Sequence, residues 1–333
     1  MSKPGANGSG RRARVGAIVA AVIGLAVATA VIGYFNVGAV LAAIAPIGLA
    51  GFLAVIAAQV VLFIPLGLAW WLVAPATPGQ APAFMGGRLA REAASDVLPF
   101  SAIGGLVIAA RVAVLGEVTS AVAFGSCVVD ISVEMVAQLI YTLVGVALLA
   151  HRLGGFAGHG QLLWPVLASL AIAVSVAGSF IATQKRGLDA IERLVRRMLP
   201  SAVEQTAAVA QVISEAYNRP VRLVVCLAIH ILCWFGAAAG TWLILDFIGH
   251  PLPFLSVVAI ESLLFAIRNA AFVVPSGLGV QEGGYALLGP LFGLPAEAAL
   301  ALSLLKRARD IVIGVPVLLV WQLLEGRRSL REA

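Results

Sequence analysis

The chain has 333 residues, of which 61% are hydrophobic and 11% are charged, with a mean hydropathy of +1.02 and a formal net charge of +6. A soluble domain has about a quarter charged residues, so this composition excludes a soluble protein. The basic residues lie beside apolar segments, where they set topology and attract anionic headgroups, and no nucleic-acid partner is expected.

The apolar segments predict an all-α polytopic membrane protein with roughly six full spans and two broken or re-entrant elements. The first segment follows four basic residues and has the length of a retained span rather than of a signal-peptide core. In chain order the segments run over 13–35, 47–73, 95–115, 118–150, 162–183, 221–248, 254–274 and 296–324.

Two segments, those near residues 95 and 254, lead into motifs rich in helix breakers. The first motif covers 97–105 and the stronger one covers 273–284, about half a chain length later, which predicts an internal duplication. Helix breaks at membrane depth are tolerated only where protein or a water-filled cavity surrounds them, so we expect both motifs to line a polar site. The predicted hinge residues are Pro99, Gly104, Gly105, Pro275, Gly277 and Gly279.

The Lys and Arg clusters at 11–14, 88–91, 185–197 and 327–331 are all expected in the cytoplasm. The two broken elements then open to opposite faces, which makes the halves inverted repeats. The predicted organisation is a single transmembrane domain over 13–325 between cytoplasmic tails at 1–12 and 326–333. Within it, repeat one covers 13–184 and repeat two covers 220–325. An amphipathic cytoplasmic helix joins them over 187–219, for which a solvated linker is the alternative.

Asp130, Glu134 and Gln138 form a polar stripe on one face of an apolar helix. An ionised side chain at the bilayer centre costs about 2.5 to 3.5 kcal/mol, so both carboxylates need partners, water or protonation. Aligning the two halves places Asp130 opposite Arg307, and we expect a buried ion pair across the repeat interface. The alternative is that these groups mark helix ends in the headgroup layer.

Other polar residues surround the two motifs. Arg111 and Arg268 are expected to contact an anionic group of a ligand, with structural ion pairs or snorkelling as the alternative. Gln281 and Glu282 lie where a half-helix begins, and its positive end favours a carboxylate or an anionic ligand.

The remaining candidates have simpler interpretations. Arg88, Arg91 and Glu92 precede the first break and are expected at the surface or at a gate. His230 is interpreted as a satisfied interior residue rather than a proton carrier. The three cysteines are expected as small buried residues, and no metal or cofactor is expected.

These motifs resemble the flippase-like membrane-domain family, which includes the transmembrane part of lysyl-phosphatidylglycerol synthases. The resemblance rests on the segment Pro275 to Gly284, its weaker copy over 98–105, Asp130 with Glu134, and Arg307 with Asp310. It covers nearly the full length, and the chain is most similar to the hopanoid-biosynthesis-associated membrane proteins of the HpnL type. The motif positions that correspond are Pro99, Gly104, Gly105, Pro275, Gly277, Gly279, Gln281 and Glu282.

The resemblance implies lipid translocation or delivery between leaflets, by two pseudo-symmetric halves around a cavity, in a bacterial inner membrane. Aminoacyl transfer in the synthases belongs to a separate soluble domain, and this chain ends soon after its last apolar segment, so no enzyme is expected. Arg111, Arg268 and Arg307 would meet a headgroup, while Asp130, Glu134 and Glu282 would balance those charges or bind a coupling proton.

Two alternatives remain open: an intramembrane lipid-modifying enzyme with Glu282 or Asp130 as general base, and a scaffold for hopanoid-biosynthesis enzymes. Expected partners are the lipid substrate and the bilayer, with a homo-oligomer or hopanoid-pathway proteins possible. No ATP-binding loop is found, so an ion gradient, a lipid gradient or a partner would drive transport.

Overall fold

The computed structural model describes residues 45–98, 101–154, 203–270 and 279–332, together with positions 175 and 178. These ranges are helical throughout apart from turns and short connections, and they contain no strand, which confirms the all-α prediction. The predicted segments 13–35 and 162–183, and the hinge residues Pro99, Pro275 and Gly277, lie outside the described residues.

The first half contains a long helix, two short ones and a second long one. Prolines lie in the first turns of η2 and α4, where a missing N–H costs nothing. The Thr119 side chain caps α6 by accepting from the backbone N–H of Val122. The elements are η1 (Ala45–Ile47), α3 (Gly48–Val73), η2 (Pro78–Gln80), α4 (Ala81–Val97), α5 (Ser101–Leu115) and α6 (Ser120–Arg152).

The second half repeats this order after an additional helix, α8. In this half a proline opens the first long helix. The elements are α8 (Val203–Tyr217), α9 (Pro220–Phe247), α10 (Phe254–Ala270), α11 (Val280–Leu288), η5 (Gly289–Phe292) and α12 (Ala296–Glu332). Helices α3, α4, α5 and α6 therefore correspond to α9, α10, α11 and α12.

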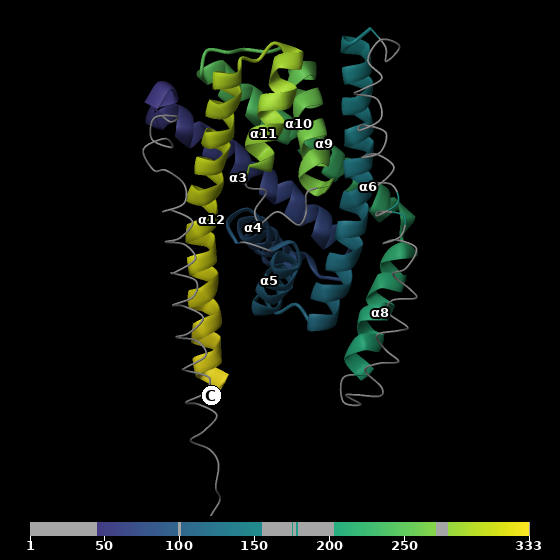
Figure 1. Cartoon of the computed structure of the whole chain (residues 1–333). Coiled ribbons are helices and arrows are strands. Elements are labelled where there is room, and N and C mark those ends of the chain that lie inside the picture. Colours follow the sequence, from purple (N-terminus) through teal and green to yellow (C-terminus); the bar gives the residue numbers. More distant parts are fainter. Residues whose placement is uncertain are drawn as a thin grey trace, which may run out of the picture.

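The packing of the helices is reciprocal. The first long helices, α3 and α9, pack on each other, while α12 packs on α4 and α6 packs on α10. In Figure 1, α6 and α12 lie along opposite sides of the molecule and run in opposite directions, with α4 and α5 nearer one end and α10 and α11 nearer the other. This is the geometry of inverted repeats, although the membrane side of each end stays a prediction.

Three described helices are long and apolar enough to cross a membrane: α3, α6 and α9. Large apolar side chains on them point outward, such as Leu49 and Val61 on α3 and Leu232 on α9. An outward apolar face of this kind is what lipid tails require. The chain is therefore a membrane protein, and the total of roughly six spans stays a prediction.

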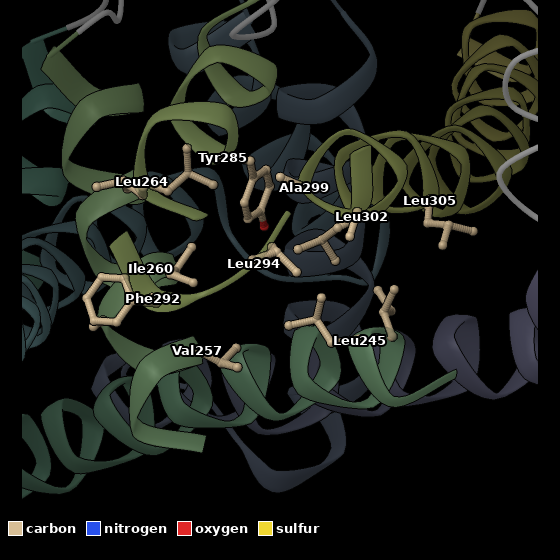
Figure 2. Close-up of a cluster of buried hydrophobic side chains, with 14 of the residues drawn as sticks. Leu245, Val257, Ile260, Leu264, Tyr285, Phe292, Leu294, Ala299, Leu302 and Leu305 are labelled. Atoms are coloured by element: carbon tan, nitrogen blue, oxygen red, sulfur yellow. The ribbon is translucent and has the colours of Figure 1, made fainter. Parts of the chain in front are cut away.

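The two largest apolar cores each draw mainly on one half of the chain. The second core gathers side chains from α9, α10, α11 and α12 with Phe52 of α3 and Leu149 of α6. Figure 2 shows Tyr285 of α11 among Leu264, Leu294, Ala299 and Leu302. The first core centres on Trp70 and Phe84, whose rings meet edge to face at 5.0 Å.

The first predicted break lies between α4 and α5, as the sequence indicates. Leu98 caps α4 with extended backbone (φ −87°, ψ 136°), the conformation that a following proline favours. The broken element is nevertheless longer than predicted, because α4 already begins at Ala81 and packs along α5 as a hairpin. Hydropathy did not predict the start of α4, because this helix contains several polar residues.

Helix α8 is the described part of the segment 187–219. It packs along α6, with Val212, Ile213 and Ala216 buried and Val212 against Gly125. A solvated linker does not fit this part of the segment. Residues 187–202 lie outside the described ranges.

Gly67 of α3 allows α3 and α4 to approach closely. A Cβ there would lie 2.5 Å from the Cα of Met85, so the two backbones would have to separate. We expect Gly67→Ala to lower the free energy of unfolding by about 1–3 kcal/mol, measured by reversible unfolding in a detergent titration. Gly240→Ala on α9 is the control, since its Cβ meets nothing within 4 Å and alanine favours a helix. Equal stability of the two variants would contradict the close contact.

Candidate functional site

A first charge cluster joins α4, α6 and α9. It consists of Arg88 and Arg91 on α4, Asp130 and Glu134 on α6, and His230 on α9. The carboxylates lie one turn apart on α6, and the arginines lie one turn apart on α4, so the two pairs can face each other.

Glu134 is the main anchor of both guanidinium groups. Its Oε1 lies 2.6 Å from Nη2 of Arg88 and its Oε2 lies 2.8 Å from Nη2 of Arg91. The Asp130 contacts are longer, 3.5 Å to Arg88 and 3.7 Å to Arg91. Arg88 also pairs with Glu92 at 2.8 Å.

The expectation that Arg88 and Arg91 lie at the surface is wrong, because the Arg88 side chain is 3% exposed and the Arg91 side chain 16%, while a role at a gate stays a prediction. Their burial follows from the charge requirement of α6. Two carboxylates in an apolar helix must meet cations, and α4 supplies them. The amphipathic pattern of residues 81–97 could have indicated that Arg88 and Arg91 share one face of a helix and pair with the carboxylates of α6.

His230 completes the cluster from α9. Its Nε2 lies 2.9 Å from Oδ1 of Asp130, and Sγ of Cys226 lies 3.8 Å from the same oxygen. These three side chains place metal-ligand atoms within 4.8 Å of one another. The guanidinium groups of Arg88 and Arg91 lie against the same carboxylate, so a divalent cation would meet two positive charges there, and the group is a poor metal site.

A second charge cluster joins α9, α10, α11 and α12. Nζ of Lys306 donates to Glu261 Oε2 at 2.6 Å, to the Tyr285 hydroxyl at 2.7 Å and to Thr241 Oγ1 at 3.2 Å. The Tyr285 hydroxyl in turn donates to Oε1 of Glu261. All three ammonium protons thus have an acceptor. Sequence reasoning did not predict this group of Glu261, Lys306 and Tyr285.

The two clusters occupy equivalent positions in the repeats with opposite charges. Arg88 and Glu261 are each the eighth residue of their helices α4 and α10, and Asp130 and Lys306 are each the eleventh residue of α6 and α12. The short helix carries the cation in the first half (Arg88 of α4) and the anion in the second (Glu261 of α10).

The predicted ion pair between Asp130 and Arg307 is wrong. Asp130 contacts Arg88, Arg91 and His230 instead, and Arg307 lies 3.6 Å from Glu282. Helices α6 and α12 lie on opposite sides of the molecule (Figure 1), so Asp130 and Arg307 meet different partners.

The second Pro/Gly motif brings its polar residues together with α12. Nε2 of Gln281 donates to Ser303 Oγ at 3.1 Å, and Ser303 Oγ donates to Glu282 Oε1 at 3.4 Å. Gln281 and Arg307 are buried, while Glu282 is 25% exposed. Glu282 lies in the first turn of α11, where the helix dipole favours a carboxylate. Gly279 precedes this helix with φ 75°, which glycine adopts without strain.

A third contact joins the short helices of the two repeats. Arg268 of α10 lies 4.0 Å from Asp96 of α4, and both side chains are partly exposed, at 28% and 27%. On the neighbouring α12, Arg309 pairs with Asp310 at 2.7 Å. Asp96 was not predicted as a site residue, because it lies only three residues before Pro99 and no sequence pattern distinguishes it.

Arg111 lies apart from these clusters. It forms an ion pair with Glu325 near the end of α12, and its side chain is 43% exposed. This is the structural ion pair given as the alternative interpretation. Gly104 is exposed and Gly105 is buried against Arg91 O and Ser95 Oγ, so only the second of these two glycines makes a tight contact.

Comparison with known proteins identifies the family of the chain. The family model described as the lysylphosphatidylglycerol synthase TM region matches residues 21–317, which is most of the chain. No curated protein and no solved structure matches the chain. The matched range contains the two charge clusters and both Pro/Gly motifs. The helical membrane fold and this match together show that the chain belongs to the lysylphosphatidylglycerol synthase TM region family, a lipid-related family of membrane proteins.

Proposed function

We propose that this protein is a lipid transporter that moves a polar lipid between leaflets or toward the outer membrane, with hopanoids or a related amphiphile as the substrate class. The observation that carries the proposal is the contact between Asp96 and Arg268, which joins α4 of one repeat to α10 of the other. In transporters built from inverted repeats, the substrate site lies where the repeats meet.

Exposure separates the charges that hold the fold from those that are open to a ligand. Arg88, Asp130 and Lys306 are at most 10% exposed and have short or multiple contacts, so they act as structural pairs. Asp96, Arg268 and Glu282 are about a quarter exposed, and their contacts are 4.0 Å and 3.6 Å long. Long, partly exposed ion pairs are easily exchanged for a ligand group.

A polar headgroup would therefore exchange with these partners while its apolar part stays in lipid. Arg268 would bind an anionic or hydroxyl group of the headgroup, and Asp96 and Glu282 would accept from hydroxyl groups. We place the protein in a bacterial inner membrane with both termini in the cytoplasm. We propose that it transports the lipid and does not act as an enzyme on it. A homo-oligomer and hopanoid-pathway proteins remain the proposed partners.

The test uses purified protein in liposomes that contain a fluorescent hopanoid or phospholipid, with a membrane-impermeant quencher to report leaflet movement. We expect Arg268→Ala and Glu282→Gln to slow movement by about tenfold or more, since each removes a charged hydrogen-bonding group. Glu297→Gln, an exposed carboxylate at the start of α12, is the matched control and should leave the rate unchanged.

Each result distinguishes a different function. Leaflet movement that depends on Arg268 and Glu282 supports transport through this site. Movement that both variants leave unchanged would exclude the site. Chemical conversion of the lipid would indicate an enzyme, and neither movement nor conversion would favour a scaffold.

A further inference from the structure

His230 is only half satisfied in its buried position. Its side chain is 0% exposed, and Nε2 contacts a carboxylate oxygen of Asp130 at 2.9 Å. An ionised carboxylate can only accept, so Nε2 carries the hydrogen in this contact. Nδ1 is buried and has no hydrogen-bond partner in the described part of the chain. The neutral ring therefore presents an unused basic nitrogen.

The charged groups around His230 carry one more negative than positive charge while the ring is neutral. Arg88 and Arg91 of α4 face Asp130 and Glu134 of α6 and Glu92 of α4, two cations against three anions, so a proton on the ring would balance the group. On the other helices that pack against α9, the ionisable groups are few or already paired: α3 has none, Glu215 of α8 accepts from Gln211, and Lys306 of α12 pairs with Glu261 of α10. The other groups nearby on α9 are the thiols of Cys226 and Cys233.

We propose that His230 is a proton-binding site that couples a proton gradient to the lipid movement proposed above, and this inference rests on that function. A proton from water binds Nδ1 and converts the ring to an imidazolium, and the same proton is released to water from Nδ1 on the other side of the membrane. Imidazole is the side chain that changes charge between about pH 5 and 8.

The coupling follows from the carboxylate of Asp130, which contacts His230 as well as Arg88 and Arg91. A cationic ring strengthens the contact between His230 and Asp130 and repels the guanidinium groups of Arg88 and Arg91. Their contacts with Asp130 are already the long ones, at 3.5 and 3.7 Å against 2.9 Å for His230. Proton binding thus weakens the Asp130 contacts of both arginines and leaves Glu134 alone to hold α4 to α6.

Helix α4 connects this event to the proposed lipid site. The helix that carries Arg88 and Arg91 also carries Asp96, which contacts Arg268 of the other repeat. Helix α4 also packs on α12. A displacement of α4 therefore changes the repeat contact where a headgroup would bind. The structure represents the neutral state, since a proton on Nδ1 would create a buried N–H without an acceptor.

The proton site is tested without any transport assay by nitrogen NMR of the intact protein, labelled with ¹⁵N-histidine, in nanodiscs. The His230→Gln variant assigns the signal, and glutamine keeps an N–H that can reach Asp130. We expect the neutral Nε2–H form at high pH and conversion to imidazolium as the pH is lowered. A His230 signal that stays neutral at every pH at which the protein remains folded would overturn the proposal.

The coupling is tested in liposomes with a pH gradient imposed in each orientation. We expect one orientation to speed lipid movement at least about fivefold over no gradient, and His230→Gln to retain movement but lose this response. His250→Gln, which changes an exposed histidine, should respond like the wild type. A wild-type rate that is the same in both orientations would overturn the coupling. If the wild type moves no lipid, the proposed function fails, and the NMR titration alone decides the proton site.

Discussion

Replacing Arg88 with methionine should lower the free energy of unfolding by about 3–5 kcal/mol, because removing one partner of a buried ion pair leaves the other charge uncompensated. Glu134 and Asp130 lose one of their two shared cations in this variant and keep only Arg91, and methionine retains most of the side-chain volume. Arg88 is 3% exposed and binds Glu134 at 2.6 Å, so neither water nor a rearranged side chain can replace it easily. Reversible unfolding in mixed detergent micelles measures the change.

The matched control is Arg111→Met. Arg111 also pairs with a glutamate, but it is 43% exposed, and exposed pairs contribute only about 0–1 kcal/mol. A combined Arg88→Met and Glu134→Gln variant should recover part of the loss, since the unpaired anion is removed as well. A loss for Arg88→Met no larger than for Arg111→Met would mean that the first charge cluster is open to water.

Replacing Lys306 with methionine should cost a similar amount, about 3–5 kcal/mol, because Lys306 serves three acceptors at once. Glu261 would keep only the hydrogen bond from Tyr285, and Thr241 would lose its donor. Adding Glu261→Gln to this variant should restore part of the stability, which identifies the unpaired carboxylate as the main cause. The same unfolding measurement reports both changes.

Arg327→Gln is the control on the same helix, because Arg327 is exposed near the end of α12. We expect a change within about 0.5 kcal/mol for this surface site. If Lys306→Met were equally mild, Lys306 would be neutral in the folded protein and the second charge cluster would not be an ion pair.

The two clusters explain how a chain of this hydropathy can hold so many ionised groups. Each repeat places a cation and an anion at equivalent positions of a short and a long helix, so each charge is neutralised within its own repeat. The polarity of these pairs is reversed between the repeats, and among the described residues the only partner from the other repeat in the first charge cluster is His230 on Asp130. The contact between Asp96 and Arg268 is a further, partly exposed ion pair between the two halves.

Much of the fold was predictable from local properties. The segments 47–73 and 221–248 correspond to α3 and α9 within a residue, because about 20 consecutive apolar residues leave the backbone no alternative to a helix in lipid. The first break lies where Pro99 and its neighbours indicate, since a residue before proline avoids the helical conformation.

The partners of the buried charges were not predictable in this way. From the sequence one can conclude that Asp130 and Glu134 need compensation, because isolated charges are too costly in an apolar helix. The folded arrangement was needed to show that Arg88, Arg91 and His230 provide it, and that Lys306 binds Glu261 and Tyr285. Hydropathy and helical period are properties of one segment, whereas an ion pair depends on which helix faces lie within about 4 Å of each other after packing.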